Sequence, residues 1–260
     1  MRLLLDHTFI TSPVVHPFVG GWVEAPAELD VKAREDLLGR DVGPEDFGLV
    51  PLPEYLWLQE THQIVPDVAV VAGNSGMVAM RSPVRPDEIG ITPVRLIDVD
   101  GAGEILARAT LRAFYGIHAS AWSRAEEEPA EVVIVSGPLA VQPPEAGFSE
   151  DLCRAWVILT GDRAVSHVLV APRAADRPSI EPLIDFLNRS IAMGHERRRE
   201  LRREISEPFR LDRDRLAELQ NAYSFELDAD DQRSAQALLQ RGTPGSVYPQ
   251  MGGVTFMARS

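Results

Sequence analysis

The chain has 260 residues, of which 45% are hydrophobic and 25% are charged, and its formal net charge is −13. This composition is typical of a globular protein and excludes a disordered chain or a coiled coil. The length exceeds the usual size of one hydrophobic core and therefore predicts two lobes or two domains, while the acidic charge repels phosphate backbones and excludes a general nucleic-acid partner.

Strands and helices alternate along the chain. Short continuous apolar runs, which are typical of strands buried on both faces, predict strands at 2–6, 47–50, 67–72, 77–80, 95–99, 131–136 and 166–171. A turn-rich segment covers 8–26, residues 32–40 resemble a short helix end, and 53–58 begin a helix or a turn. Helical patterns predict helices at 103–114, 148–159, 179–205, 215–223 and 230–241. The acidic run 126–129 predicts a solvated loop. This alternation predicts an α/β fold with mixed, mainly parallel sheets flanked by helices.

Few side chains with covalent or metal chemistry are present. Lys32 is the only lysine, which argues against Schiff-base catalysis, and Cys153 is the only cysteine, which excludes an internal disulfide and a Cys-based zinc site. The six histidines show no metal-ligand spacing, so we expect no metal.

The chain shows no targeting or membrane segment. The apolar run at Met1–Asp6 is too short for a signal peptide, and no stretch reaches the length of a membrane span. We therefore expect a cytoplasmic protein, provided that no export signal has been removed.

Several segments resemble the chorismate dehydratases, which catalyse the first step of the futalosine route to menaquinone. Residues 46–56 (DFGLVPLPEYL) are similar to a family stretch that ends in Glu-Tyr. Residues 151–161 match the family pattern D-L-x-x-x-W-x-x-L-T-G at Asp151-Leu152, Trp156 and Leu159-Thr160-Gly161. The resemblance spans roughly residues 44–241 and implies a two-lobed fold of the class II periplasmic-binding-protein type.

This resemblance also implies where the lobes and the ligand lie. Lobe one would be formed by 1–78 and 172–260, lobe two by 79–171, and a small molecule would bind in the cleft between them. Members of the family use no metal or organic cofactor, so we expect none here.

The chain departs from the family at several polar positions. Two family serines correspond to Pro51 and Leu52, and a third corresponds to Met77. A Thr-Ser pair at a helix start corresponds to 102–103 (Ala-Gly), an Asp corresponds to Pro138, and no Asn stands near the first strand. Because a site that recognises an anion depends on its hydrogen-bond donors, chorismate recognition would need donors at other positions.

Two groups of polar side chains are candidates for contact with the ligand. Thr8, Thr11 and Ser12 follow the first strand, and ligands of open α/β sheets bind beyond the carboxyl ends of strands. Asn74 and Ser75 stand on a Gly-flanked kink at the first predicted lobe crossing. The alternative for both groups is a local structural role in a loop or turn.

A third candidate is the backbone of Gly101, Ala102 and Gly103, which opens a predicted helix. Free N–H groups and the helix dipole suit an anion there, although Asp98 and Asp100 would resist one and could cap the helix instead. A tight turn without a ligand is the alternative. His7 is the one candidate acid or base, with a structural histidine as its alternative.

Two classes of function follow. The first is a lyase that removes water from chorismate or a related enolpyruvyl carboxylate, with the sister enzyme that acts on a cyclic futalosine derivative as a variant of the same class. The second is a non-catalytic solute-binding or sensor protein. In both, the partner is a small molecule, a carboxylate in the first, and the oligomeric state stays open.

Overall fold

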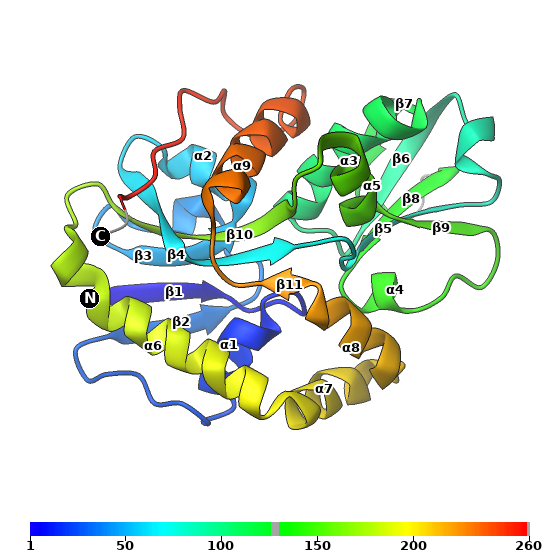
Figure 1. Cartoon of the computed structure of the whole chain (residues 1–260). Helices are drawn as coiled ribbons and strands as arrows, with labels where there is room; N and C mark the ends of the chain where they lie inside the picture. Colours follow the sequence, from blue (N-terminus) through cyan, green and yellow to red (C-terminus); the bar gives the residue numbers. More distant parts are fainter. Residues whose placement is uncertain (126–129, 259–260) are drawn as a thin grey trace.

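Two β-sheets divide the molecule into two lobes, as Figure 1 shows. The computed structural model describes residues 1–125 and 130–258, so the acidic run 126–129, expected to be a solvated loop, lies outside the described residues. The first sheet has the strand order β11-β4-β10-β3-β1-β2, and the second has the order β7-β6-β8-β5-β9. The chain therefore forms a two-lobed α/β fold with helices flanking both sheets.

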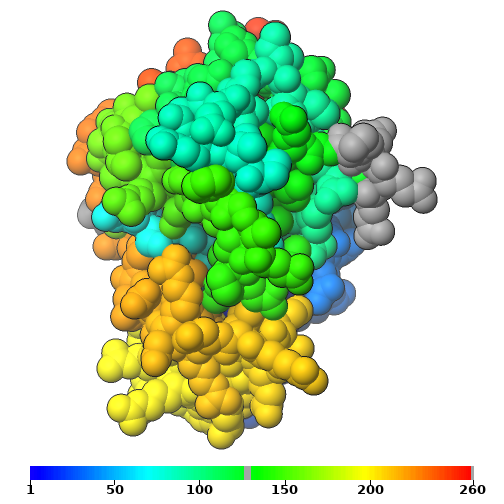
Figure 2. Space-filling view, turned by 90° about the vertical axis from the view of Figure 1, so that its right-hand side faces the viewer, coloured from blue at the N-terminus to red at the C-terminus, as the bar shows by residue number. Residues whose placement is uncertain are grey.

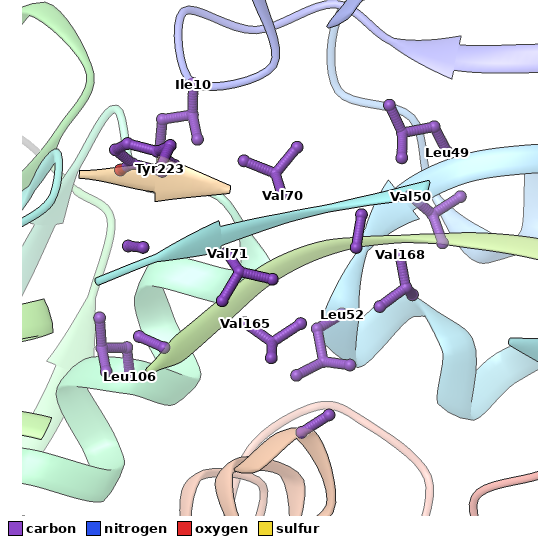
Figure 3. Packing of buried hydrophobic residues seen from close by; sticks show 14 of the residues in the cluster. Ile10, Leu49, Val50, Leu52, Val70, Val71, Leu106, Val165, Val168 and Tyr223 are labelled. Atoms are coloured by element: carbon purple, nitrogen blue, oxygen red, sulfur yellow. The ribbon is translucent and has the colours of Figure 1, made fainter. Parts of the chain in front are cut away.

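The first lobe contains both ends of the described chain. Its strands are β1 (Arg2–Asp6), β2 (Asp30–Arg34), β3 (Phe47–Pro51), β4 (His62–Ala72), β10 (Ala164–Pro172) and β11 (Tyr223–Ser224). Its helices are α1 (Ser12–Val19), α2 (Tyr55–Leu58), α6 (Arg177–Glu196), α7 (Arg198–Ser206), α8 (Arg213–Asn221) and α9 (Ala229–Gly242), with 3-10 turns η1 (Gly39–Asp41), η2 (Leu52–Glu54) and η4 (Glu207–Phe209). Val70 and Val71 of β4 point to opposite faces of this sheet, and both are fully buried because helices cover both faces (Figure 3).

The second lobe is built from the middle of the chain. Its strands are β5 (Val78–Ser82), β6 (Ile91–Ile97), β7 (His118–Ser123), β8 (Val132–Ser136) and β9 (Phe148–Asp151). Its helices are α3 (Gly101–Tyr115), α4 (Pro138–Val141) and α5 (Leu152–Thr160), with the 3-10 turn η3 (Pro86–Glu88). The Asp100 carboxylate accepts a hydrogen bond from the Gly103 N–H at 2.7 Å, and Gly116 closes α3 in the left-handed conformation at φ 73°.

The return crossing between the lobes comes earlier than the expected boundary at 171/172. Strand β10 begins at Ala164 and pairs with β3 and β4 of the first sheet, with Ala164 opposite Ala72. The whole of β10 therefore lies in the first lobe, and the chain crosses back between Thr160 and Ala164.

Several elements differ from the sequence expectation. Residues 32–40 form the end of edge strand β2 and the turn η1 in place of a helix, because 30–34 alternate between exposed and half-buried positions beside β1. Residues 8–26 contain α1, and 148–159 divide into β9 and α5 where Asp151 caps the helix. The expected helix 179–205 divides at Arg197, whose guanidinium lies 4.0 Å from the ring centroid of Trp22.

The sheets are mixed, without the expected majority of parallel pairs. Parallel pairing joins β1 to β2 and β3, and joins β6 to β7 and β8. The other pairings between named strands, those of β10, β11, β5 and β9, are antiparallel.

Contacts beyond the crossings also hold the lobes together, and two of them are side-chain hydrogen bonds far from the cavity. The indole of Trp156 on α5 is fully buried and donates to the Ser234 Oγ on α9 at 3.0 Å. The second lobe also lies on α7 and α8, shown in gold in Figure 2, where the Gln142 amide donates to the Phe209 carbonyl at 3.3 Å.

Replacing Ser234 tests the first of these contacts. Ser234→Ala removes the acceptor for the buried Trp156 N–H, and the Ser234 hydroxyl also donates to the Arg163 carbonyl at 2.6 Å. An unpaired buried donor costs about 1–3 kcal/mol, so we expect a loss of that size in the free energy of unfolding, measured by urea denaturation. Gln236→Ala, at an exposed position of the same helix, is the control and should change it by less than about 0.5 kcal/mol. Equal effects would contradict the assignment.

Candidate functional site

A cavity of about 390 Å³ lies between the two lobes. It is lined from the first lobe by Thr8, Phe9, Ile10 and Asp36, and from the second lobe by Arg95, Leu96, Ile97, Asp98, Val99, Asp100, Arg124, Ser136, Gly137 and Pro138. Strands β1, β6 and β8 end at this cavity. It therefore occupies the carboxyl edge of strands from both sheets, which is where α/β proteins bind small molecules.

Charged side chains of both signs line the cavity. Arg95 and Arg124 supply positive charge, and Asp36, Asp98 and Asp100 supply carboxylates. A ligand that combines a carboxylate with hydroxyl groups would match this arrangement, because guanidinium groups bind carboxylates and carboxylates accept from hydroxyls.

The Arg124 side chain is fixed on the second lobe. Its guanidinium donates to the Val99 carbonyl at 2.6 Å and to the Glu104 carboxylate at 2.8 Å. The Glu104 carboxylate also accepts from Arg108 at 2.9 Å. Glu104 and Arg108 both belong to α3, so this helix holds the Arg124 guanidinium in place.

A buried polar cluster underlies the cavity. The His167 Nε2 lies 3.0 Å from the Asp6 carboxylate and 3.8 Å from the Asp100 carboxylate, and its Nδ1 lies 2.8 Å from the Ser166 hydroxyl. The Nε2 side of the ring can donate to the Asp6 carboxylate, and the Nδ1 side can accept from the Ser166 hydroxyl. Asp6 and His167 belong to the first lobe and Asp100 to the second, so this cluster joins the lobes directly beneath the ligand space.

Asp100 is the member of this cluster that lines the cavity. Its side chain is only 15% exposed, and burial raises the pKa of its carboxyl. The nearby His167 and the Gly103 N–H oppose that shift in pKa, and Asp6 adds to it. The structure therefore places a carboxyl with a raised pKa in a cavity that two arginines also line.

The backbone is strained on both sides of the cavity. Asp36 (φ 54°) and Asp98 (φ 53°) adopt the left-handed conformation that non-glycine residues rarely adopt. The Ser136 hydroxyl donates to the Asp98 carbonyl at 2.6 Å and holds that conformation. Such strain is concentrated at functional sites because the surrounding structure must maintain it.

The loop after β1 contains one predicted residue that lines the cavity and others that support it. Thr8 lines the cavity. Thr11 is buried, accepts from the Thr8 N–H at 2.9 Å and donates to the Asp6 carbonyl at 2.6 Å. Ser12 is buried and donates to the Phe9 carbonyl at 2.8 Å. His7 does not line the cavity, and burial lowers the pKa of its imidazole.

The two other predicted groups lie outside the cavity lining. Asn74 is exposed, and the Ser75 hydroxyl donates to the Asp151 carboxylate at 2.9 Å. A Cβ added at Gly101 would lie 2.1 Å from the Tyr248 hydroxyl, so the C-terminal segment covers this glycine. Ala102 and Gly103 are buried, and Asp100 already accepts from the Gly103 N–H.

The positions that depart from the family pattern are mostly in the core. Leu52, Met77 and Ala102 are buried among hydrophobic residues, and Pro138 lines the cavity. The groups that sequence reasoning missed are Asp6 and His167 beneath the cavity and Asp36, Arg95 and Arg124 around it. Asp6 alone carried a local signal, because it directly follows an apolar strand and precedes the Thr8 loop.

The described residues contain no group of three or more His, Cys, Asp or Glu side chains arranged to hold a metal ion. Among the helices of residues 1–125 and 130–258, none combines the length and apolar character needed to cross a membrane.

Comparisons with known proteins identify both the family and the fold. A family model described as menaquinone biosynthesis matches residues 42–244. No curated protein matches the sequence significantly. Among solved structures, protein AF1704 from Archaeoglobus fulgidus is 14% identical, with a TM-score of 0.71 over 94% of this chain and 97% of that one.

Two further solved structures share the fold. The periplasmic aliphatic sulphonate binding protein SsuA from Escherichia coli is 12% identical, with a TM-score of 0.63 over 96% of this chain and 94% of that one. The CA3427 gene product of Candida albicans, described as having the generic periplasmic binding protein fold, is 12% identical, with a TM-score of 0.57 over 92% and 89%. The periplasmic-binding-protein-like fold and the family expected from the sequence are confirmed.

Replacing Asp98 by glycine tests the strain at the cavity. Asp98→Gly relieves the left-handed strain, so we expect the free energy of unfolding to rise by about 0.5–1 kcal/mol in urea denaturation. Arg210→Gly is the matched control, because Arg210 has φ 53° but does not line the cavity. A loss of stability in Asp98→Gly alone would show that the Asp98 side chain outweighs the strain.

The raised pKa of Asp100 predicts a pH-dependent stability. The folded chain keeps this proton at pH values where the unfolded chain has lost it, so stability falls as pH rises from the unfolded pKa through the folded pKa. Asp100→Asn removes that loss and can still accept from the Gly103 N–H. Thermal unfolding should show the variant more stable than wild type at about pH 8, with the gain vanishing near pH 4. The exposed Asp87→Asn is the control, and a variant less stable at pH 8 would contradict the assignment.

Proposed function

The chain belongs to the menaquinone biosynthesis family, and on that premise we propose that it is a chorismate-dehydratase-like lyase. It binds chorismate or a related enolpyruvyl carboxylate in the cavity between the lobes. The observation that carries this proposal is the meeting of Arg95, Arg124 and the buried Asp100 carboxyl at one interlobe cavity.

The charges of the cavity support a hydroxylated carboxylate as the substrate. Arg95 and Arg124 offer guanidinium donors to a carboxylate, and such charge-assisted bonds are stronger than neutral ones. Asp36 and Asp98 offer acceptors to a hydroxyl group. These groups replace the family hydroxyls that are absent at Leu52 and the other departing positions.

The reaction needs orientation and movement of one proton. Loss of water breaks one C–H bond and one C–O bond of the substrate, forms a C=C bond, and releases the hydroxyl with a proton as water. Asp100 is suited to handle that proton because burial raises the pKa of its carboxyl. Positioning by the two arginines supplies the remainder of the catalysis.

A second candidate is a non-catalytic binding protein that uses the same cavity. It is favoured by the burial of Leu52 and Met77 where family members have serines, which leaves Thr8 and Ser136 as the hydroxyl side chains at the cavity. The SsuA structure of the same fold is that of a sulphonate-binding protein.

Incubation with chorismate separates the two functions. We expect the ultraviolet absorbance of chorismate to fall with time in the presence of the protein. A thermal shift without turnover would support the binding protein instead. The absence of both turnover and a thermal shift would contradict both functions.

Charge-removing variants then test the site. Arg95→Gln and Arg124→Gln should each weaken chorismate binding about tenfold or more, because a hydrogen bond to a charged group contributes about 1.5–3 kcal/mol. Arg85→Gln is the control, since Arg85 is exposed and pairs with Asp87 on the surface. Unchanged affinity in both cavity variants would place the ligand elsewhere.

A further inference from the structure

We propose that binding of a carboxylate in the interlobe cavity is coupled to the uptake of one proton by Asp100. This inference rests on the proposed function only in using the same cavity, and it holds for an enzyme and for a binding protein alike. It makes the affinity of the site depend on pH in a defined direction.

In the described part of the chain, the ion pair of Asp100 is the long contact to His167. His167 Nε2 is the basic nitrogen beneath the cavity, but it lies 3.0 Å from the Asp6 carboxylate and 3.8 Å from the Asp100 carboxylate. The shorter contact goes to Asp6, whose other oxygen accepts from the Leu37 N–H at 3.0 Å. One Asp100 oxygen accepts from the Gly103 N–H, the other lies 3.8 Å from His167 Nε2, and the residue lines the cavity.

The other charged groups around Asp100 do not make up for the missing short ion pair. Arg124 opposes the rise in the pKa of Asp100 less than His167 and the Gly103 N–H do, and its guanidinium pairs with Glu104. Arg95 shares the cavity, but Asp98 and Asp36 do as well. The remaining titratable groups that interact with Asp100, which are Tyr248, Tyr223 and Cys153, are neutral at physiological pH because burial raises the pKa of each.

A bound carboxylate further disfavours the ionised form of Asp100. Two negative charges in one cavity repel each other, and protonation of one carboxyl removes that repulsion, as in paired carboxylates generally. The ligand therefore binds more tightly to the chain with Asp100 protonated. Between the pKa of Asp100 in the free protein and its higher value in the complex, affinity falls about tenfold per pH unit.

Proton uptake can be measured directly on mixing. The protein is mixed with chorismate in lightly buffered solution that contains a pH indicator, in parallel with thermal-shift measurements of binding. Turnover does not disturb the count, because loss of water from chorismate releases no net proton and leaves both carboxylates charged. We expect a fast uptake that approaches one proton per protein when the pH lies between the two pKa values.

Matched variants identify the group. Asp100→Asn and Asp100→Ser both keep a cap for the Gly103 N–H, and each should bind chorismate without proton uptake and with an affinity that no longer falls as pH rises. Asp36→Asn removes a different carboxyl of the same cavity and should retain the uptake.

The outcomes separate this inference from the proposed function. Binding or turnover without proton uptake, or uptake that persists in both Asp100 variants, overturns the coupling and leaves the function in place. The absence of both binding and turnover overturns the function and the coupling together.

Discussion

An imidazole buried between two carboxyl groups ties the two halves of this molecule together. His167 and Asp6 come from β10 and β1 of the first sheet, and Asp100 comes from the start of α3 in the second lobe. Burial of this imidazole is tolerated because it is hydrogen-bonded to Asp6 and to the Ser166 hydroxyl. Asp100 lies 3.8 Å from the same ring, so the cluster places the start of α3 beside the first sheet at the cavity.

Much of the fold could be predicted because its strands are buried on both faces. The apolar runs of β1, β3 and β10 predict strands directly. The pattern of α3 predicts a helix equally well, because the helix begins at the Asp100 cap and ends at Gly116. Strand β2 could not be predicted in the same way, because it is an edge strand whose polar alternation resembles a helix end. The division of α6 from α7 falls at Arg197, whose guanidinium lies over the Trp22 ring, a contact that no local pattern encodes.

The residues of the candidate site could be predicted only where their position in the local sequence indicates a role. Thr8 could be found because it follows the first strand, and Asp6 carried the same local signal, whereas His167 and Arg124 are brought to the site by the folding of distant segments. The amides at 101–103 have the sequence of an anion site, but Tyr248 of the C-terminal segment covers Gly101. The positions where the family has hydroxyl side chains are occupied here mainly by buried apolar residues. The polar groups that line the cavity are mainly charged side chains from other positions.

The central claim is that one organic carboxylate binds between the lobes. The most direct test is a crystal structure of the protein with chorismate, or with the product formed from it, at saturating concentration. Our account predicts the ligand in the cavity beside Thr8 and Asp100, with a carboxylate oxygen within hydrogen-bond distance of the Arg95 or Arg124 guanidinium. A ligand on another surface of the protein, or an empty cavity at saturation, would contradict it.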